Sequence, residues 1–225
     1  MPVLNVRSML PGFVASVLVG TGVILIGYFF LGQVLGQAAG DTATNGGDPN
    51  GFNVPKLEGG ANAAAGPEAG PKDKTLELTV PGMARIRDDV IPDATGGDEA
   101  ALKKSAAIHL KGTGFPWQKG ANVYLAGHRL GYPRTESWLT FWDLDKLEDG
   151  DRVFVTDANQ TEYTYRVFKE SIVAPTDLSV TEPVPGKSVL TLQTCTLPDY
   201  SKRLVVQAEL VGKRPVGAKE GGQQV

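Results

Sequence analysis

The sequence predicts a mainly β domain with one or two short helices, preceded by a single N-terminal transmembrane helix. Two observations lead to this prediction. Several short segments alternate apolar with polar residues, which is typical of strands that bury one face. An uncharged, mostly apolar run occupies residues 13–31 and is long enough to cross a bilayer as a helix. The residues beyond this run and the linker after it are enough for one domain with its own core.

The N-terminal third predicts an anchored, extracytoplasmic protein. Arg7 lies before the apolar run, so residues 1–12 are expected in the cytoplasm and the rest of the chain outside the cell membrane. A cleaved signal peptide is the alternative, but the run is long for the apolar core of a signal. Residues 32–74 are rich in Gly, Ala, Asn and Pro and are expected to form a flexible extracytoplasmic linker. Residues 212–225 are expected to form a disordered tail.

The first half of the domain predicts two strands and two helices. Residues 75–80 alternate strictly, and residues 83–90 are expected to form a second short strand. Asp98 is a suitable N-cap for a short helix over residues 98–107. Residues 138–147 carry apolar side chains at helical spacing and predict a short amphipathic helix.

The second half predicts a hairpin, a long loop and a further pair of strands. Residues 152–156 and 163–168 alternate as strands on either side of a polar turn. Residues 173–186 contain Pro175, Pro183 and Pro185, too many prolines for the interior of a sheet, and predict a loop. Two β-favouring segments then supply the last pair of strands, at residues 188–195 and 203–206.

The only cysteine of the chain, Cys195, lies where the predicted strand 188–195 leaves the sheet. A lone cysteine is often a buried, inert residue. An odd cysteine in an exported protein instead suggests a reactive thiol. A strand end is also a place where a scaffold can hold a side chain firmly beside a substrate. Cys195 is therefore the candidate nucleophile.

A histidine and an arginine lie where a thiol nucleophile needs them. His128 follows the apolar segment 123–127, so its strand end neighbours that of Cys195 if the two strands lie side by side. An imidazolium or guanidinium favours the thiolate of a group whose ordinary pKa is ~8.5. His128 can protonate a leaving amine, and Arg203 can return along a hairpin to hold an oxyanion. The second histidine, His109, lacks this setting and is expected to be structural.

These residues resemble the motifs of one enzyme family. Thr191-Leu192-Gln193-Thr194-Cys195 resembles the TLxTC signature of sortases, Leu125-Ala126-Gly127-His128 resembles their histidine motif, and Arg203 falls where the family has its essential arginine. Sortases are membrane-anchored cysteine transpeptidases of Gram-positive bacteria. The resemblance covers residues 75–211, and the sequence from Gly127 to Tyr132 is most similar to class E, with classes D and F as alternatives.

The resemblance implies a closed, mainly antiparallel β-barrel of about eight strands in which residues 75–211 form the catalytic domain. It also implies cleavage of an LAxTG or LPxTG sorting signal between Thr and Gly through a thioacyl-enzyme. The secreted protein then passes to an amine of a peptidoglycan precursor or cross-bridge, or to a pilin lysine. The implied catalytic residues are His128, Cys195 and Arg203, and no metal or organic cofactor is needed. The candidate substrate-binding residues are Tyr132, Thr194, Thr176, Asp177 and Leu178.

Several alternatives remain open on the sequence. A cell-surface cysteine hydrolase would pass the acyl group to water, and a non-catalytic β-barrel binding module would leave Cys195 buried and inert. In several sortases a segment before the domain acts as a lid; residues 52–55 are the only candidate here, and a simple tether is the favoured interpretation. Some sortases bind calcium at acidic loops, but a solvated turn is favoured for the acidic residues from Asp143 to Asp151. A net charge of −3 does not indicate a nucleic-acid partner.

Overall fold

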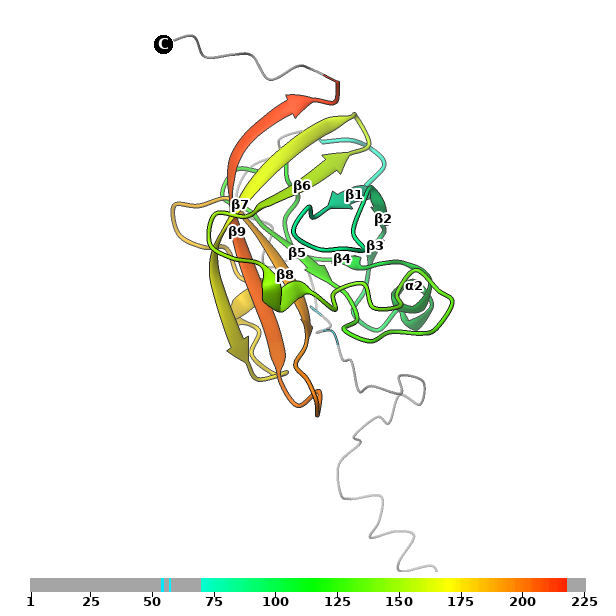
Figure 1. Ribbon diagram of the computed structural model, residues 1–225. Helices are drawn as coiled ribbons and strands as arrows, with labels where there is room; N and C mark the ends of the chain where they lie inside the picture. Colours follow the sequence, from blue (N-terminus) through cyan, green and yellow to red (C-terminus); the bar gives the residue numbers. More distant parts are fainter. Residues whose placement is uncertain (1–53, 55–56, 58–69, 218–225) are drawn as a thin grey trace, which may run out of the picture. The chain divides into compact units, whose positions relative to one another are not determined.

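The computed structural model describes Val54, Leu57 and residues 70–217 (Figure 1). The predicted transmembrane segment, residues 13–31, and most of the predicted linker lie outside the described residues. Among the residues that the structure describes, no helix is both long and apolar enough to span a membrane. The anchor therefore stays a prediction.

The described residues form one curled sheet of nine strands. In chain order the strands are β1 (Leu76–Thr79), β2 (Asp89–Ile91), β3 (Asp93–Ala94), β4 (Ile108–Leu110), β5 (Asn122–Ala126), β6 (Arg152–Asp157), β7 (Thr161–Val173), β8 (Val189–Cys195) and β9 (Arg203–Pro215). Across the sheet the order is β2-β1-β6-β7-β9-β8-β5-β4-β3. Neighbouring strands are antiparallel except in the pairs β3–β4 and β5–β8.

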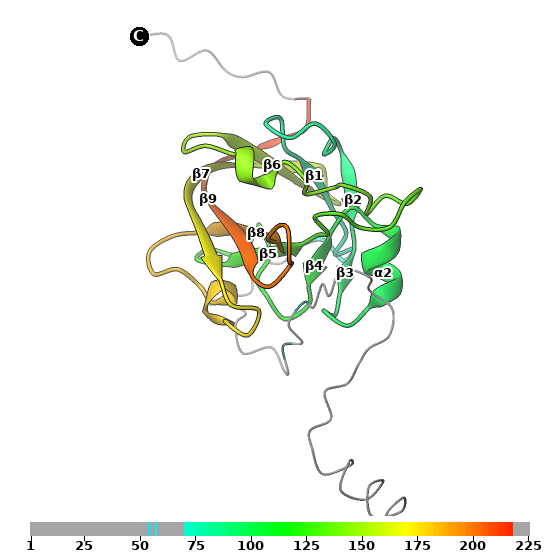
Figure 2. The ribbon, with the colours of Figure 1, turned by 60° about the horizontal axis from the view of Figure 1, so that its bottom comes forward.

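The sheet closes almost completely on itself. The two strands at the ends of the order, β2 and β3, are consecutive in the chain with only Pro92 between them. In Figure 2 the strands accordingly follow one another around a ring, with α2 (Glu99–Lys104) outside it. The predicted mainly β, mainly antiparallel class is confirmed, as a nearly closed barrel-like sheet of nine strands instead of a closed one of about eight.

Alternate residues of the strands supply two separate apolar clusters, because successive side chains of a strand point to opposite faces. The inner cluster collects side chains from strands all around the sheet, among them Leu76, Leu78, Val123, Leu125, Val153, Val155, Tyr165, Leu190, Leu192, Leu204 and Val206. The outer cluster consists of Val54, Ala94, Leu102, Ile108, Leu110, Tyr124, Ala126 and Cys195. The strands β5 and β8 contribute to both clusters, one from each face.

The first predicted helix is confirmed and the second predicted strand is not. The Asp98 side chain caps α2 by accepting from the Ala101 N–H at 3.0 Å, and the helix ends at Lys104, before residue 107. The strand predicted over residues 83–90 begins only at Asp89. Before it, the Arg87 guanidinium donates to the main-chain carbonyls of Val80, Met83 and Ile86, which holds this segment in turns.

The amphipathic helix predicted over residues 138–147 is wrong. The segment consists of turns and one short 3-10 helix, η2 (Leu144–Lys146). Its main chain bonds to the loop after β5, with the Leu139 N–H donating to Leu130 O at 2.9 Å and the Phe141 N–H to His128 O at 3.1 Å. These bonds replace the i to i−4 bonds of a helix. The apolar pattern still describes burial, since Phe141, Leu144 and Leu147 all lie in the inner cluster.

The second half of the domain follows the prediction closely, apart from its end. β6 and β7 form the predicted hairpin, with Asp157 Oδ1 accepting from the N–H groups of Asn159 and Thr161 at 2.9 Å. β8 and β9 form the predicted last pair. Residues 212–215, predicted to belong to a disordered tail, instead continue β9, and Pro215 pairs with Thr161 of β7.

Candidate active site

Three neighbouring strand ends bring His128, Cys195 and Arg203 to one edge of the sheet. β5 runs parallel to β8 with Ala126 opposite Gln193, so His128 and Cys195, each two residues further on, lie at the same level. β9 runs antiparallel to β8, and Arg203 is the direct partner of Cys195. Directly opposed residues of an antiparallel pair point to the same face. Cys195 therefore lies between the strand that leads to the histidine and the strand that begins with the arginine.

All three side chains are buried. The exposed fractions are 2% for His128, 1% for Cys195 and 2% for Arg203. The Arg203 Nη1 donates to the main-chain carbonyls of Tyr200 and Lys202, both at 3.1 Å. The loop that follows Cys195 is closed by the Thr196 N–H, which donates to Lys202 O at 3.1 Å. The guanidinium is thus oriented by the same short loop that joins Cys195 to its strand partner.

The packing around Gly127 leaves little room for a side chain directly before His128. A Cβ on Gly127 would lie 3.0 Å from Ala106 O and 3.1 Å from the Phe141 ring, which is tighter than most Cβ contacts. The Gly127 N–H also donates to Gln193 O at 3.0 Å, which continues the β5–β8 pairing by one residue. The main chain that carries His128 is therefore pressed between the loop after α2 and the segment that contains Phe141.

Tyr132, a candidate substrate-binding residue, lies beside His128. The two rings meet edge to face with centroids 5.5 Å apart. The loop that carries Tyr132 is tight: Gly131 has φ +66, and a Cβ there would lie 1.9 Å from Ser137 O. The Tyr132 N–H donates to Ser137 Oγ at 3.2 Å, and the Lys103 ammonium lies 5.1 Å from the centroid of the Tyr132 ring. This placement is consistent with a residue that borders the substrate, although the contact with substrate stays a prediction.

The face of β8 that carries Cys195 also carries buried polar side chains. Thr191 Oγ1 donates to Asn122 Oδ1 at 2.7 Å, and Gln207 Nε2 donates to Thr191 Oγ1 at 3.4 Å. One step closer to Cys195, the Tyr124 hydroxyl donates to Gln193 Oε1. Burial raises the pKa of Tyr124, and the Arg203 charge opposes that rise, which places the phenol in the electrostatic field of Arg203.

The proline-containing loop predicted over residues 173–186 lies against this face. It contains η3 (Ser179–Thr181), and Asn122 Nδ2 fastens it by donating to the carbonyls of Val180 and Glu182 at 2.9 Å. Val180 packs against the outer cluster, which includes Cys195.

The three predicted contact residues of this loop precede η3. Thr176 and Leu178 are exposed, Leu178 with 44% of its surface in solvent. Asp177 Oδ1 accepts from the hydroxyl and the N–H of Ser179, and these hydrogen bonds lower the pKa of Asp177. Its charge also influences Tyr124. The loop is thus next to the site, while the roles of its three residues stay predictions.

Thr194, a candidate substrate-binding residue, has its side chain on the other face of β8 from Cys195. The alternation along β8 puts Thr194 on the face of Leu190 and Leu192, which belong to the inner cluster, and opposite to the face of Cys195. Its side chain is fully buried there. A substrate beside the sulfur is on the other side of the strand.

Part of the predicted tether packs against the candidate site. Val54 is 1% exposed and belongs to the outer cluster together with Cys195, and Leu57 packs against the same cluster. Both residues fall within the range 32–74, for which a flexible linker is expected. The signal in the sequence is small: two apolar residues three positions apart in a segment otherwise rich in Gly, Ala and Asn.

The second histidine has a structural role, as predicted. His109 is fully buried in β4. Its Nδ1 lies 2.8 Å from Asp93 Oδ1, its Nε2 lies 2.9 Å from Gly114 O, and its ring packs on Phe115 with centroids 4.3 Å apart. Both ring nitrogens thus join β3 and β4 to the loop that follows them, far along the chain from Cys195.

Acidic residues of the region after Tyr132 have basic partners. Asp145 Oδ2 accepts from Arg129 Nη2 at 2.7 Å, and Asp143 Oδ1 accepts from Lys146 Nζ at 2.6 Å. Arg129 also lies over the Trp142 ring, 6.0 Å from its centroid, so this residue next to His128 fixes η2 against the site. No cluster of metal-ligating side chains occurs among the residues that the structure describes.

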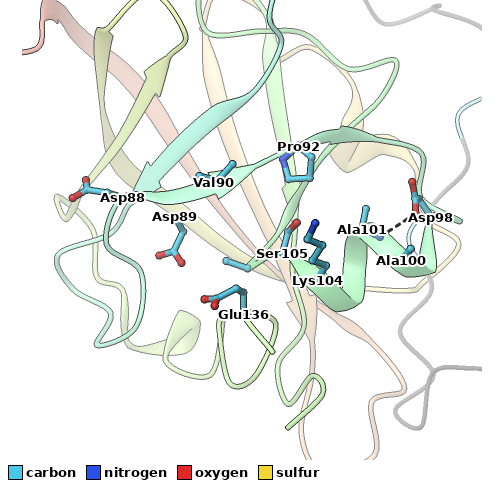
Figure 3. A pocket seen from close by; sticks show the side chains of 11 residues that line it. Asp88, Asp89, Val90, Pro92, Asp98, Ala100, Ala101, Lys104, Ser105 and Glu136 are labelled. Carbon is cyan, nitrogen blue, oxygen red and sulfur yellow. Dashed lines mark hydrogen bonds between the residues drawn. The ribbon is translucent and has the colours of Figure 1, made fainter. Parts of the chain in front are cut away.

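A separate hollow of about 680 Å³ lies between β2 and α2 (Figure 3). Asp88, Asp89 and Glu136 gather at one end of it and Lys104 lies near its middle. Burial raises the pKa of Asp89, with a further contribution from the charge of Glu136. None of the predicted site residues lines this hollow, so it is not the continuation of the Cys195 site.

Comparison with sequence relatives finds sortases. Residues 78–211 match the family model described as Sortase domain. Sortase A of Streptococcus agalactiae is 39% identical over 92 residues, which is 40% of this chain and 37% of the relative. Sortase SrtE1 of Streptomyces coelicolor is 33% identical over 146 residues, 57% of this chain and 39% of the relative. The matches thus span about two fifths of the length of these relatives.

Solved structures lead to the same family. Sortase E from Streptomyces avermitilis superimposes with a TM-score of 0.52 at 32% identity, over 64% of this chain and 93% of that one. Sortase A from Corynebacterium diphtheriae gives a TM-score of 0.53 at 26% identity, over 63% and 62% of the two chains. Similarity to sortase E is compatible with class E without selecting it over the other classes. Because the family model covers more than half of the sequence and the fold agrees, this chain belongs to the sortase family.

Proposed function

We propose that the chain is a membrane-anchored cysteine transpeptidase that cleaves a C-terminal LAxTG or LPxTG sorting signal between Thr and Gly. The observation that carries this proposal is the meeting of Cys195, His128 and Arg203 at three adjacent strand ends. The strands fix the relative positions of the three residues, as acyl transfer through a thiol requires. Membership of the sortase family supports the reaction class.

The proposed reaction is acyl transfer in two halves. The Cys195 thiolate attacks the carbonyl carbon of the signal's threonine, and the carbon–nitrogen bond to glycine breaks as a thioester forms. His128 gives its proton to the departing glycine amine. An acceptor amine then attacks the thioester carbonyl and gives a proton to His128, now neutral, so that an amide forms and the sulfur leaves as the thiolate. Arg203 holds the carbonyl oxygen as negative charge develops on it.

The setting of the reaction is also part of the proposal. The apolar run at residues 13–31 would hold the domain on the outer side of the cell membrane, where secreted proteins with sorting signals and peptidoglycan amines meet. The sequence from Gly127 to Tyr132 supports class E, and with it a preference for alanine over proline at the second signal position. The acceptor amine is either a peptidoglycan precursor or cross-bridge, or a pilin lysine.

The test is a ligation assay with the full chain in detergent. LAxTG and LPxTG peptides are mixed with an amine acceptor, and the products are read by mass spectrometry. We expect the peptide up to threonine joined to the amine, and a thioacyl adduct on Cys195 when the amine is left out. Products of hydrolysis alone, unchanged by added amine, would show a cysteine hydrolase instead. The absence of any cleavage or adduct would contradict both enzymes.

A further inference from the structure

Gln193 lies on the same face of β8 as Cys195, two residues before it. Its side chain is 2% exposed. The residue opposite on β9 is Val205, which offers no polar group to an amide. The Gln193 side chain is thus in the outer face of the sheet, next to the candidate nucleophile.

The Gln193 amide has one end occupied. Its Oε1 accepts from the Tyr124 hydroxyl on β5, so its Nε2 points away from that phenol. This Nε2 is buried and has no hydrogen-bond partner among the residues that the structure describes. A buried donor without an acceptor is costly, since it has given up water and received nothing in return.

The next polar row on the same face shows that the fold can satisfy such groups. Asn122 donates from its Nδ2 to two carbonyls of the loop at η3, and its Oδ1 accepts from Thr191. Gln207, an amide of the same type as Gln193, donates to Thr191. Thr191 of this row is only two residues before Gln193 on β8. On this face of β8, the unfilled donor is therefore the one beside Cys195.

We propose that Gln193 Nε2 donates a hydrogen bond to a main-chain carbonyl of the peptide that acylates Cys195. This inference rests on the proposed function and names a substrate-positioning residue for it. The acceptor fits the chemistry: every residue of an extended peptide presents a carbonyl, so the contact does not depend on the signal's side chains. The proposal puts the acyl part of the signal on the same side of the sulfur as the loop that Asn122 fastens against this face.

The spacing selects the carbonyl. Two residues of a strand span ~6.8 Å, and two residues of an extended peptide span about the same length. With the threonine carbonyl at the sulfur of Cys195, a peptide that runs along β8 places the carbonyl of the second signal residue near Gln193. The contacted group is then the amide between the second and third signal residues.

The experiment is a double-mutant cycle on binding, in which the full chain carries Cys195→Ala so that no turnover is needed. The probes are an LAxTG peptide and its analogue with an (E)-alkene in place of the amide between the second and third residues. We expect the alkene to raise Kd about three- to tenfold with Gln193 present. In Gln193→Met we expect the LAxTG peptide itself to bind with this raised Kd, and the alkene analogue to bind no more weakly than the peptide. Gln207→Met is the matched control and keeps the full response to the alkene.

The outcomes separate the inference from the proposed function. If the increases in Kd caused by Gln193→Met and by the alkene multiply when the two are combined, Gln193 does not contact this carbonyl and the inference is overturned. Coupled losses in binding, with no ligation by the chain that retains Cys195, would uphold the contact and contradict the transpeptidase. Tyr124→Phe controls for the phenol that loses its acceptor: it keeps the donor, so the response to the alkene persists. If the alkene still raises Kd in Gln193→Met but no longer does so in Tyr124→Phe, the assignment to Gln193 is overturned.

Discussion

The two faces of the central strands differ in chemistry although both are buried. On the inner face, β5 and β8 present Val123, Leu125, Leu190 and Leu192, which need only close packing. On the outer face, the same strands present the thiol of Cys195 together with polar side chains that hydrogen-bond to one another. Exposure therefore does not reveal the site in this molecule. What marks it is a row of buried polar groups where an apolar residue would be more stable.

The difference suggests a division of labour that substitutions can test. The inner face should determine whether the domain folds, because its contacts join strands from all around the sheet. The outer face should determine what the domain does, because its polar groups converge on one strand end. Substitutions on the inner face should then lower stability, and substitutions on the outer face should lower activity at nearly constant stability.

The largest effect is expected from the outer face. Cys195→Ala removes the proposed nucleophile, and the chain has no other thiol to replace it. We expect no detectable ligation of an LAxTG peptide to an amine, together with a Tm close to that of the unaltered protein. Mass spectrometry and thermal unfolding measure the two quantities on the same preparation. Ligation at an unchanged rate would contradict the mechanism, and loss of folding would contradict the division between the faces.

The next largest effect is expected from the inner face. Leu192 lies between Thr191 and Gln193 on β8, and its side chain is fully buried on the inner face, opposite to theirs. Leu192→Ala should lower the free energy of unfolding by about 2–5 kcal/mol, the usual range for such a truncation in a core. Urea unfolding measures it. We expect the folded fraction to keep its ligation rate per active site, as titrated by a thiol-reactive probe; a strong loss of that rate would mean that the faces are coupled.

A smaller loss is expected at His128. His128→Ala removes the proposed proton donor for the leaving amine, and we expect ligation to slow by at least ~10²-fold, the usual scale of general acid–base catalysis. The formation of the thioacyl adduct should slow with it, while peptide binding changes little. Single-turnover mass spectrometry separates the formation of the thioacyl adduct from peptide binding. His109→Gln is the comparison, because His109 joins β3 and β4 away from Cys195; its effect should fall on Tm.

The part of the domain that was predicted correctly from the sequence is the part set by local pattern. The alternation in residues 188–195 and 203–206 predicts strands, and a short connection between them makes Arg203 the neighbour of Cys195. The same alternation puts the side chain of Thr194 on the opposite face of β8 from that of Cys195, although the two residues are adjacent in the motif.

The rest depends on groups distant in the sequence. Residues 138–147 have the apolar spacing of a helix, yet the carbonyls of His128 and Leu130 accept their N–H groups and the segment stays in turns. Val54 is buried only because the outer cluster exists for it to join. The unfilled donor of Gln193 is visible only once the hydrogen bonds of its neighbours are known. Contacts between residues distant in the sequence decide all three of these features, and a local sequence pattern does not contain such contacts.

A further test concerns how the outer face is covered. Val54→Asp places a carboxylate that cannot be buried in the outer cluster without a partner, so we expect this residue to leave the cluster. The thiol of Cys195 should then react several-fold faster with iodoacetamide in the native protein. Val90→Asp, at a position 58% exposed, is the control and should leave the rate unchanged. An unaltered rate in Val54→Asp would mean that other residues of the cluster protect the sulfur.

The smallest effect, and the sharpest test of class, is expected at Tyr132. Its ring meets His128 edge to face, so the ring is beside the proposed substrate site. A phenol can donate to a peptide backbone, and alanine at the second signal position leaves more room there than proline, which also fixes φ.

Tyr132→Phe keeps the ring contact with His128 and removes only the hydroxyl. Loss of one hydrogen bond at ~0.5–1.5 kcal/mol predicts a several-fold drop in the preference for LAxTG over LPxTG, with stability unchanged. Ligation rates of the two peptides in competition measure the ratio directly. A wild-type preference for LPxTG would contradict class E, whereas an unchanged ratio in Tyr132→Phe would reduce Tyr132 to a packing partner of His128. In that second case the outer face would hold its substrate by the main chain, through contacts such as the one proposed for Gln193, and the preference at the second signal position would come from another residue.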